Sequence, residues 1–308
     1  MGGYASVRVI CLDVFYRRTA VSMFLSVRDV ILRYAGYESL SEGLRDLRID
    51  SFELYMSRDL KTQPINGERF NLASRDEAAR LKRFLDAHGF KVCALLLAND
   101  FSNPDLGREV AYVNKGLEAA YRLEACVVRI NALMREIQGY GLEDYVARTA
   151  EAVRLCMRLC KKTGVSLAVE NHGVVANRVE FLKALFDRFP DGHLGLTLDT
   201  GNFYWFGYPI NQLYEIYETL APYVKHTHVK NAAAKPGKKD VMRKPREVEM
   251  TPLYEGDIAL DRVIDILRKT GYGYDLTIED ESLHRFKPEE RITVLRKDAE
   301  YLKGLLSS

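Results

Sequence analysis

The stretch Leu194-Gly195-Leu196-Thr197-Leu198-Asp199-Thr200-Gly201-Asn202 has the pattern of a buried strand that ends in a carboxylate. Its leucines alternate, Thr197 is β-branched, and Gly201 follows two residues after Asp199. An acidic side chain at the end of a buried strand is where α/β proteins often keep their chemistry. Taken alone, Asp199 is explained equally well as the cap of a following helix.

The same pattern recurs along the chain at a regular distance. Glu170 ends the apolar run of residues 167–170, twenty-nine residues before Asp199, and His228 lies in the β-rich run of residues 224–230, twenty-nine residues after it. Residues 274–279 end in Glu279, fifty-one residues beyond His228. Because a βαβ unit takes roughly 30 residues or more, the pattern predicts successive parallel strands with helices between them. Their C-terminal ends share one face, which predicts that four side chains point into the same space: Glu170, Asp199, His228 and Glu279.

Strand and helix patterns alternate through the rest of the chain. The other predicted strands are residues 7–14, 49–55, 90–97 and 126–130. The predicted helices are residues 41–48, 74–87, 106–124, 141–163, 178–189, 211–220, 257–270 and 288–306, and residues 21–34 also show helical spacing. The competing fold, an open doubly wound sheet, usually has a glycine-rich phosphate turn, and neither GxGxxG nor GxxxxGK[ST] occurs. The alternation therefore predicts an α/β fold, a (β/α)8 TIM barrel, as a single domain over residues 1–308.

Length and composition restrict the classes of protein that fit. The 308 residues suit one barrel, and 47% hydrophobic with 29% charged residues is typical of a globular protein. A net charge of +2 gives no polybasic signal, so no nucleic acid and no membrane partner is expected. There is no N-terminal signal pattern and no apolar run long enough to span a bilayer. The five cysteines show no metal-type pairing, which favours buried reduced thiols and a cytoplasmic protein.

Three carboxylates and one imidazole make an oxygen-rich set of ligands. Such a set suits one divalent ion, with Mn²⁺, Mg²⁺ or Co²⁺ favoured and Fe²⁺ or Zn²⁺ also compatible. Each residue alone is explained by a cap or a surface charge, and His228 by a core histidine. Four such coincidences at four consecutive strand ends are harder to accept than one metal site.

Five segments of the C-terminal half carry a recognisable pattern: Glu170-Asn171-His172, Leu198-Asp199-Thr200-Gly201-Asn202, His228-Val229-Lys230-Asn231, Glu255-Gly256-Asp257 and Thr277-Ile278-Glu279. Together they resemble the xylose isomerase-like TIM-barrel superfamily of sugar isomerases and epimerases, which also contains endonuclease IV. The resemblance covers residues 165–281, and the N-terminal half matches only in its strand–helix rhythm. It implies that one divalent metal is bound by Glu170, Asp199, His228 and Glu279.

The resemblance also implies a reaction. In the ketose epimerases, the residues at the places of Glu170 and Glu279 are the catalytic acid–base pair. A metal with open positions for a carbonyl and a hydroxyl would stabilise the enediolate that forms when the neighbouring carbon loses its proton. Return of the proton to the opposite face gives an epimerase, and return to the adjacent carbon gives an isomerase. The sequence leaves both open, and it leaves the substrate open among sugars, sugar acids and sugar phosphates.

Weaker candidates for substrate binding surround these four residues. His172 could bond a substrate hydroxyl or be an ordinary loop histidine, and Trp205 could form an apolar wall for a sugar ring. Lys230 could offset substrate charge or pair with a carboxylate inside the barrel. Asn202 stands where the ketose epimerases have a substrate-binding histidine, and this difference argues against 3-epimerisation of a ketose.

Side chains on other strands have less specific roles. His226 is expected to be packed rather than to bind a metal. Glu53 and Arg129 could line the mouth of the barrel, although buried ion pairing is favoured. The basic residues 235–246 could be a lid for an anionic substrate or a solvated loop. The aromatic-rich residues 15–37 could close the site or form a subunit contact, which leaves a homo-oligomer open.

Three alternative functions remain. A metal-dependent dehydratase or lyase, acting on a keto-inositol or a cyclic acid, would share the site but expel a β-hydroxyl. A nuclease of the endonuclease IV type would need a histidine-rich cluster of three metals, and this chain has only six histidines. A binding protein without catalysis would not need four intact ligands.

Overall fold

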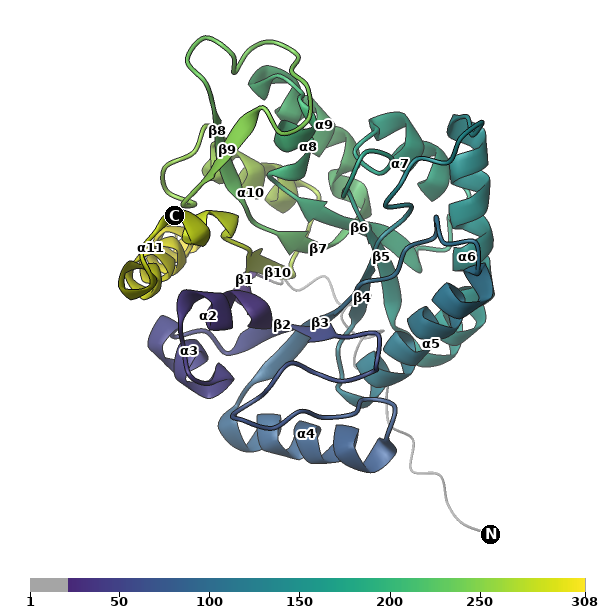
Figure 1. The fold of residues 1–308 in the computed structure, drawn as a ribbon, viewed down its shortest axis with the longest axis vertical. Coiled ribbons are helices and arrows are strands. Elements are labelled where there is room, and N and C mark those ends of the chain that lie inside the picture. Colours follow the sequence, from purple (N-terminus) through teal and green to yellow (C-terminus); the bar gives the residue numbers. More distant parts are fainter. Residues whose placement is uncertain (1–21, 308) are drawn as a thin grey trace.

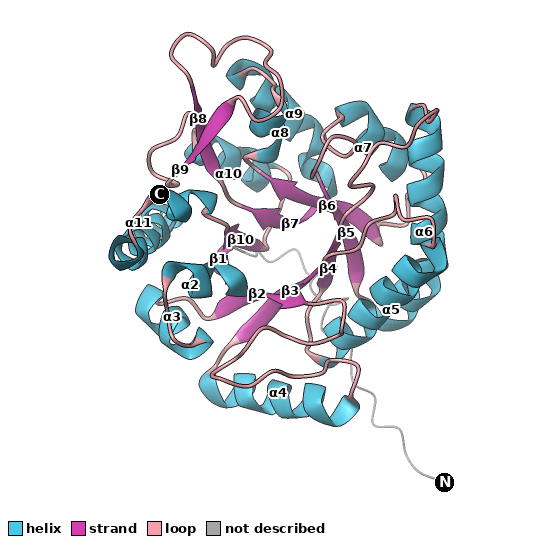
Figure 2. Ribbon diagram, viewed as in Figure 1, coloured by secondary structure: helices cyan, strands magenta, loops and turns pink. Residues whose placement is uncertain are grey.

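Eight parallel strands run around a barrel, with helices on its outside (Figures 1 and 2). The structure is a computed structural model that describes residues 22–307. The strand order is β10-β1-β2-β3-β4-β5-β6-β7. Their bounds are β1 (Phe24–Arg28), β2 (Ser51–Met56), β3 (Lys91–Leu97), β4 (Val127–Ile130), β5 (Ser166–Glu170), β6 (Leu194–Asp199), β7 (Val224–His228) and β10 (Asp275–Ile278). The fold is therefore the predicted (β/α)8 TIM barrel.

The last seam of the barrel, between β7 and β10, is closed by a short bridge. Val229 pairs with Ile278 in parallel, and the Val229 amide donates to the Thr277 carbonyl at 2.8 Å. The Glu279 amide in turn donates to the Val229 carbonyl at 3.1 Å. This bridge sets the end of β7 beside the end of β10.

The helices that surround the barrel match most of the predicted ones within a few residues. They are α2 (Asp29–Ala35), α3 (Leu40–Leu47), α4 (Arg75–His88), α5 (Leu106–Arg122), α6 (Leu142–Thr163), α7 (Val179–Phe186), α8 (Asn202–Phe206), α9 (Ile210–Leu220), α10 (Leu260–Lys269) and α11 (Pro288–Ser307). Two 3₁₀ turns, η1 (Ala221–Tyr223) and η2 (Glu281–Arg285), complete the set. The main core lies between these helices and the strands, where Phe52, Leu54 and Leu198 are fully buried.

The first strand of the barrel was predicted wrongly. Residues 7–14 lie outside the described residues, and the barrel has its eight strands without them. Its first strand is β1, inside the stretch whose spacing predicted a helix. Helix α2 starts at Asp29, directly after the strand ends at Arg28, so no glycine or proline marks the change from strand to helix.

A two-stranded antiparallel hairpin that the sequence did not predict follows β7. It consists of β8 (Asn231–Ala234) and β9 (Val248–Thr251), with Asn231 paired to Thr251. The Asn231 amide donates to the carbonyls of Leu253 and Ile258, at 2.9 and 3.0 Å, and its oxygen accepts from the amides of Ala232 and Ile258. One side chain thus joins the hairpin to the segment before α10.

Gly256 is required at this junction. A Cβ at Gly256 would lie 1.9 Å from the Asn231 Oδ1 and 2.8 Å from the Ala232 amide nitrogen. We expect Gly256→Ala to lower the free energy of unfolding by roughly 1–3 kcal/mol, the usual cost of overpacking a rigid site. Chemical denaturation measures it. Gly304→Ala is the control, because a Cβ there meets nothing within 4 Å and alanine favours the helix. Equal stability of the two variants would contradict the prediction.

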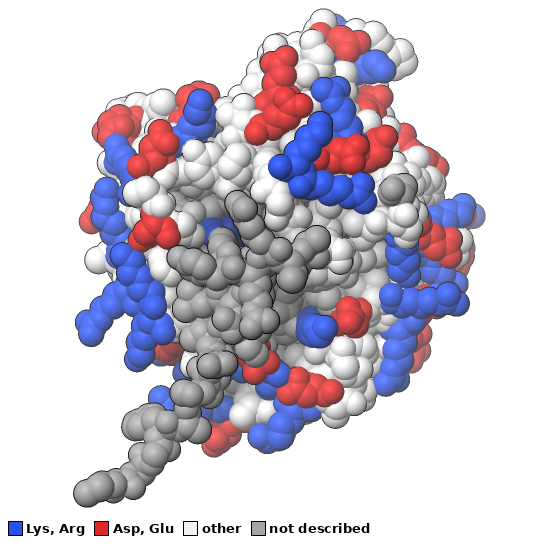
Figure 3. Space-filling view, turned by 180° about the vertical axis from the view of Figure 1, so that it is seen from behind, with Lys and Arg blue, Asp and Glu red and all other residues white. Residues whose placement is uncertain are grey.

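The cysteines agree only partly with the expectation of reduced thiols. Cys93, Cys156 and Cys160 are free, whereas Cys126 is disulfide-bonded. No helix among residues 22–307 is long and apolar enough to cross a membrane. On the face turned away from the viewer of Figure 1, basic and acidic side chains are interspersed (Figure 3). Both signs occur on the visible part of the described residues in this view, in keeping with the net charge of +2.

Candidate metal centre

Four strand ends bring the four predicted ligands together. Glu170, Asp199 and His228 are the last residues of β5, β6 and β7, and Glu279 directly follows β10. All four are buried, and one ligand atom from each lies within 4.8 Å of the others. The strand register explains the arrangement, because Asp199 pairs directly with His228 across β6 and β7.

Side chains that follow the strand ends hold neighbouring strands in position. The Asn171 amide oxygen accepts from the Asp199 backbone amide at 2.8 Å, and its nitrogen donates to the Asp199 carbonyl at 3.0 Å. The Thr200 hydroxyl does the same for Lys230, accepting from its amide at 2.8 Å and donating to its carbonyl at 2.7 Å. The motif residues Asn171 and Thr200 therefore fix the backbone from which the ligands project.

The two oxygens of the Asp199 carboxylate have different partners, one in its own turn and one in the cluster. Its Oδ1 accepts from the backbone amides of Gly201 and Asn202, each at 2.9 Å. Its Oδ2 faces the ammonium group of Lys230 at 2.9 Å, in an ion pair without hydrogen-bond geometry. Burial raises the pKa of Asp199 to about 6, although the charge of Lys230 opposes this.

Three buried atoms of the cluster receive no hydrogen bond. They are Asp199 Oδ2, His228 Nδ1 and Glu279 Oε2. His228 Nδ1 lies 2.9 Å from Glu279 Oε2 and 3.4 Å from Glu170 Oε2, so these atoms converge on one small volume. Buried polar atoms normally have a partner. Unsatisfied oxygen and imidazole atoms that converge in this way fit a divalent cation.

Each of the two glutamates is paired with its own arginine. Arg129, on β4, contacts Glu170, and Arg28, at the end of β1, contacts Glu279. Burial alone would raise the pKa of Glu170, but the charges of Arg129 and His228 hold it well below its usual value. Glu170 is therefore a carboxylate at neutral pH, as a metal ligand must be.

Lys230 lies among carboxylates rather than free in the mouth of the barrel. Its ammonium nitrogen is 2.9 Å from Asp199 Oδ2, 3.4 Å from Glu279 Oε2 and 2.9 Å from Glu281 Oε1. Burial would lower the pKa of Lys230, but Asp199 and Glu281 raise it above its usual value. The sequence left two roles open for Lys230, to offset substrate charge or to pair with a carboxylate inside the barrel. The structure shows the pairing with carboxylates.

The charges that these contacts link are not balanced. Burial would lower the pKa of His226, but Asp275 and Glu53 raise it to about 10, so this imidazole is a cation. Four linked cations thus face six carboxylates: Arg28, Arg129, His226 and Lys230 against Glu53, Glu170, Asp199, Asp275, Glu279 and Glu281. Carboxylates therefore outnumber cations among these groups, which favours the binding of a cation.

The four candidates for substrate binding lie in different surroundings. His172 Nδ1 is 3.0 Å from Asn131 Oδ1 and 3.2 Å from an Arg129 nitrogen, and burial lowers the pKa of His172 to about 4. The Asn202 side chain donates to Glu170 Oε1 at 3.0 Å. Trp205 lies further along α8, with its ring 5.9 Å from the Arg246 guanidinium. Lys230 and Asn202 thus contact the cluster directly, and His172 reaches it through Arg129.

Residues that the sequence treated as minor complete the network. Glu53 and Arg129 form buried ion pairs, as favoured from the sequence. His226 is packed inside the barrel, between Glu53 and Asp275. Arg28 was missed because its strand was missed, and Glu281 because it follows the last motif. Strand assignment alone would have placed Arg28 at the mouth, one strand from Glu279.

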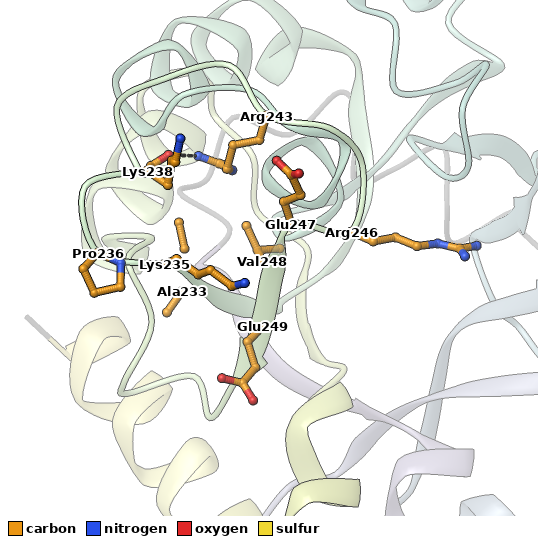
Figure 4. A pocket seen from close by; sticks show the side chains of 10 residues that line it. Ala233, Lys235, Pro236, Lys238, Arg243, Arg246, Glu247, Val248 and Glu249 are labelled. Carbon is orange, nitrogen blue, oxygen red and sulfur yellow. Dashed lines mark hydrogen bonds between the residues drawn. The ribbon is translucent and has the colours of Figure 1, made fainter.

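The basic residues 235–246 connect β8 to β9 and border a cavity of about 800 Å³ (Figure 4). Arg243 holds this segment, because its guanidinium donates to the carbonyls of Lys238, Tyr204 and Tyr208 at 2.7, 3.1 and 2.9 Å. Figure 4 shows Arg246 extending away from the other labelled side chains. Part of the segment is thus tied to α8.

One family model matches residues 43–305, and its description is xylose isomerase-like TIM barrel. This chain belongs to that family. The match includes all four candidate ligands and reaches well into the N-terminal half, where the sequence showed only a strand–helix rhythm. No curated protein sequence matches the chain.

Several solved structures have the same fold as this chain. An IolI protein with a bound zinc atom has 17% identity and a TM-score of 0.67, with 92% of this chain and 98% of that chain covered. D-psicose 3-epimerase from Clostridium cellulolyticum H10, with D-tagatose, has 14% identity and a TM-score of 0.66, covering 92% and 99%. The probable 3-DHS dehydratase AsbF from Bacillus anthracis has 14% identity and a TM-score of 0.63, covering 91% and 99%. At these identities the likeness establishes the fold alone.

Proposed function

We propose that this protein is a metal-dependent sugar isomerase or epimerase, with a sugar, a sugar acid or a sugar phosphate as substrate and a single domain as the catalytic unit. The observation that carries the proposal is the cluster of Glu170, Asp199, His228 and Glu279, with its unsatisfied atoms and its excess negative charge. The fold is that of a family whose structures include epimerases. Four ligands at a barrel mouth also suit an enzyme better than a simple binding protein.

The roles of the residues follow from their positions. Glu170, Asp199, His228 and Glu279 would hold the divalent ion. When bound, the ion supplies the Lewis acidity that stabilises negative charge on a substrate oxygen. Glu170 and Glu279 come from different strands and both approach His228 Nδ1, and in the proposed reaction one removes a proton and the other returns it. Asn202 and Arg129 orient Glu170, and Arg28 orients Glu279.

The substrate would meet polar groups around this pair. Lys230 can exchange its contact with Glu281, whose side chain is 45% exposed, for a substrate oxygen. His172 is neutral at pH 7, so it can donate to or accept from a hydroxyl. Trp205 would offer an apolar face further from the ion. These groups favour a polyhydroxylated small molecule over a nucleic acid.

A dehydratase is the alternative that the comparisons keep open. A mannonate dehydratase from Streptococcus suis serotype 2 also shares the fold, at 12% identity and a TM-score of 0.64. The same glutamates would then remove the proton while a β-hydroxyl departs. The nuclease has less support, because His228 is the one histidine in the four-ligand cluster of the described residues.

Two measurements test the proposed function. Elemental analysis of the purified protein should find about one divalent ion per chain, of Mn²⁺, Mg²⁺, Co²⁺, Zn²⁺ or Fe²⁺ type. An NMR screen in D₂O should then show deuterium entering one carbon of a candidate sugar or sugar acid. A chelator should stop this incorporation of deuterium. Loss of water from the substrate would point to the dehydratase, and cleavage of a phosphodiester to the nuclease. A protein without metal affinity would refute the metal centre.

A further inference from the structure

We propose that Glu53 is a positioning residue, which holds the ring of His228 through Nε2 so that Nδ1 faces the ion. The proposal rests on the proposed metal centre, and it assigns a function to a carboxylate outside the four ligands. Glu53 lies on β2, and its side chain is buried inside the barrel. Its Oε1 is 2.9 Å from His228 Nε2, across the barrel interior.

The two nitrogens of His228 face different partners. Nε2 can donate to Glu53, since an ionised carboxylate only accepts, and an ion can bind Nδ1 once that nitrogen carries no proton. That nitrogen is the buried one without a hydrogen bond, and it faces Glu170 and Glu279. In many metal sites a carboxylate orients a ligand histidine in this way.

Glu53 is held in place by two other cationic groups. Its Oε2 is 3.0 Å from Arg28 Nε, and its Oε1 is also 2.9 Å from His226 Nε2. The other nitrogen of His226 lies 2.8 Å from Asp275 Oδ2, which accepts from the Thr277 hydroxyl at 2.7 Å. His226 thus lies between the carboxylates of Asp275 and Glu53, and Glu53 Oε1 can accept from both His226 and His228.

Arg28 links the orientation of His228 to that of a second ligand. The same guanidinium that bonds Glu53 also contacts Glu279. Around the barrel, β10 lies between β1, which ends at Arg28, and β7, which ends at His228. Residues on β1 and β2 therefore position both His228 and Glu279. A change at Glu53 should thus disturb metal binding without removing any ligand.

The first test reads the tautomer directly in the wild-type protein. Histidine labelled with ¹⁵N gives different long-range correlations for the two tautomers, and His228→Asn identifies the signals of His228. In the Zn²⁺-loaded protein we expect Nε2 to carry the proton and Nδ1 to be the nitrogen bound to the ion. Zn²⁺ on Nε2, or a proton on Nδ1, would overturn the proposal, and this result requires no variant of Glu53 to fold.

The second test measures metal affinity by competition with a chromophoric chelator, using Zn²⁺ and Co²⁺. Glu53→Gln should weaken binding by roughly 10- to 100-fold, the usual effect of removing such a partner, and should alter the visible spectrum of bound Co²⁺. Glu109→Gln is the matched control, because it is the same substitution at a buried glutamate that pairs with Arg58 and lies outside the charged cluster. Its affinity should stay close to that of the wild type.

The outcomes separate this inference from the proposed function. Wild-type protein that binds one ion, beside folded Glu53→Gln that binds it equally well, would refute the positioning role and leave the metal centre standing. Equal weakening by Glu109→Gln would show that the effect is general destabilisation, and it would also refute the role. Two ions per wild-type chain, reduced to one in Glu53→Gln, would mean that Glu53 is itself a ligand and would refute the positioning role. Wild-type protein that binds no ion would refute both proposals.

Discussion

Glutamine in place of Glu170 or Glu279 is expected to lower turnover by ~100-fold or more for at least one of the two, even at saturating metal. Glutamine keeps the size of the side chain and one oxygen ligand, but it cannot accept the proton. If a glutamate only bound the ion, raising the metal concentration would restore most of the activity. A loss that persists at saturation therefore reports the movement of a proton.

The measurement is the rate of deuterium exchange into the substrate, recorded as a function of metal concentration. Glu281→Gln provides the matched control, since it is the same substitution two residues from Glu279 and it removes only the exposed partner of Lys230. Its loss should be much smaller. Complete rescue of both Glu170→Gln and Glu279→Gln by excess metal would disprove the acid–base assignment, although the metal site would remain.

Asp199→Asn should act mainly on metal affinity. We expect a loss of more than about 100-fold, because second partners of ligands already contribute 10- to 100-fold. The turn should survive, since an asparagine oxygen can still accept from the amides of Gly201 and Asn202. The variant amide would face Lys230 without a negative charge, so one of the charges that attracts the ion is lost.

Thermal unfolding with and without metal checks this prediction. A ligand at 1,000 times its Kd stabilises the native state by about 4.1 kcal/mol, and a 100-fold weaker site loses about 2.7 kcal/mol of that. The melting temperature of Asp199→Asn should therefore rise much less with added metal than that of the wild type. An equal rise would show that Asp199 is not a ligand.

The sequence predicted the C-terminal half of the barrel better than the N-terminal half. Strands β5, β6 and β7 end in three of the candidate ligands and the fourth directly follows β10, so pattern and motif agreed on Glu170, Asp199, His228 and Glu279. Strand β1 is five residues long and continues directly into α2. The spacing of its apolar residues therefore could not be separated from the helical spacing that follows. The hairpin of β8 and β9 was hidden because three alanines and a basic loop give no strand alternation.

The partners of the ligands could not be predicted for a different reason. Glu53 and His228 are separated by 175 residues, and only the closed barrel brings their side chains to 2.9 Å. The same holds for Arg28 and Glu279, which come from opposite ends of the described chain. Local patterns identify residues at strand ends, whereas partners across the barrel depend on its closure and on strand tilt.

The seam between β1 and β10 joins the first and last strands of the described barrel, and this bears on when an ion could bind during folding. Phe24 pairs with Asp275 across this seam, and the side chain of Arg28 crosses it to reach Glu279. Because Glu279 follows the last barrel strand to be synthesised, the full set of ligands cannot exist until nearly the whole chain has left the ribosome. An ion bound to residues as distant as 170 and 279 would then join the two ends of a long loop, and such a clip favours the folded chain by restricting the unfolded one. Capture of the ion would thus mark the end of assembly and hold the newly closed barrel shut.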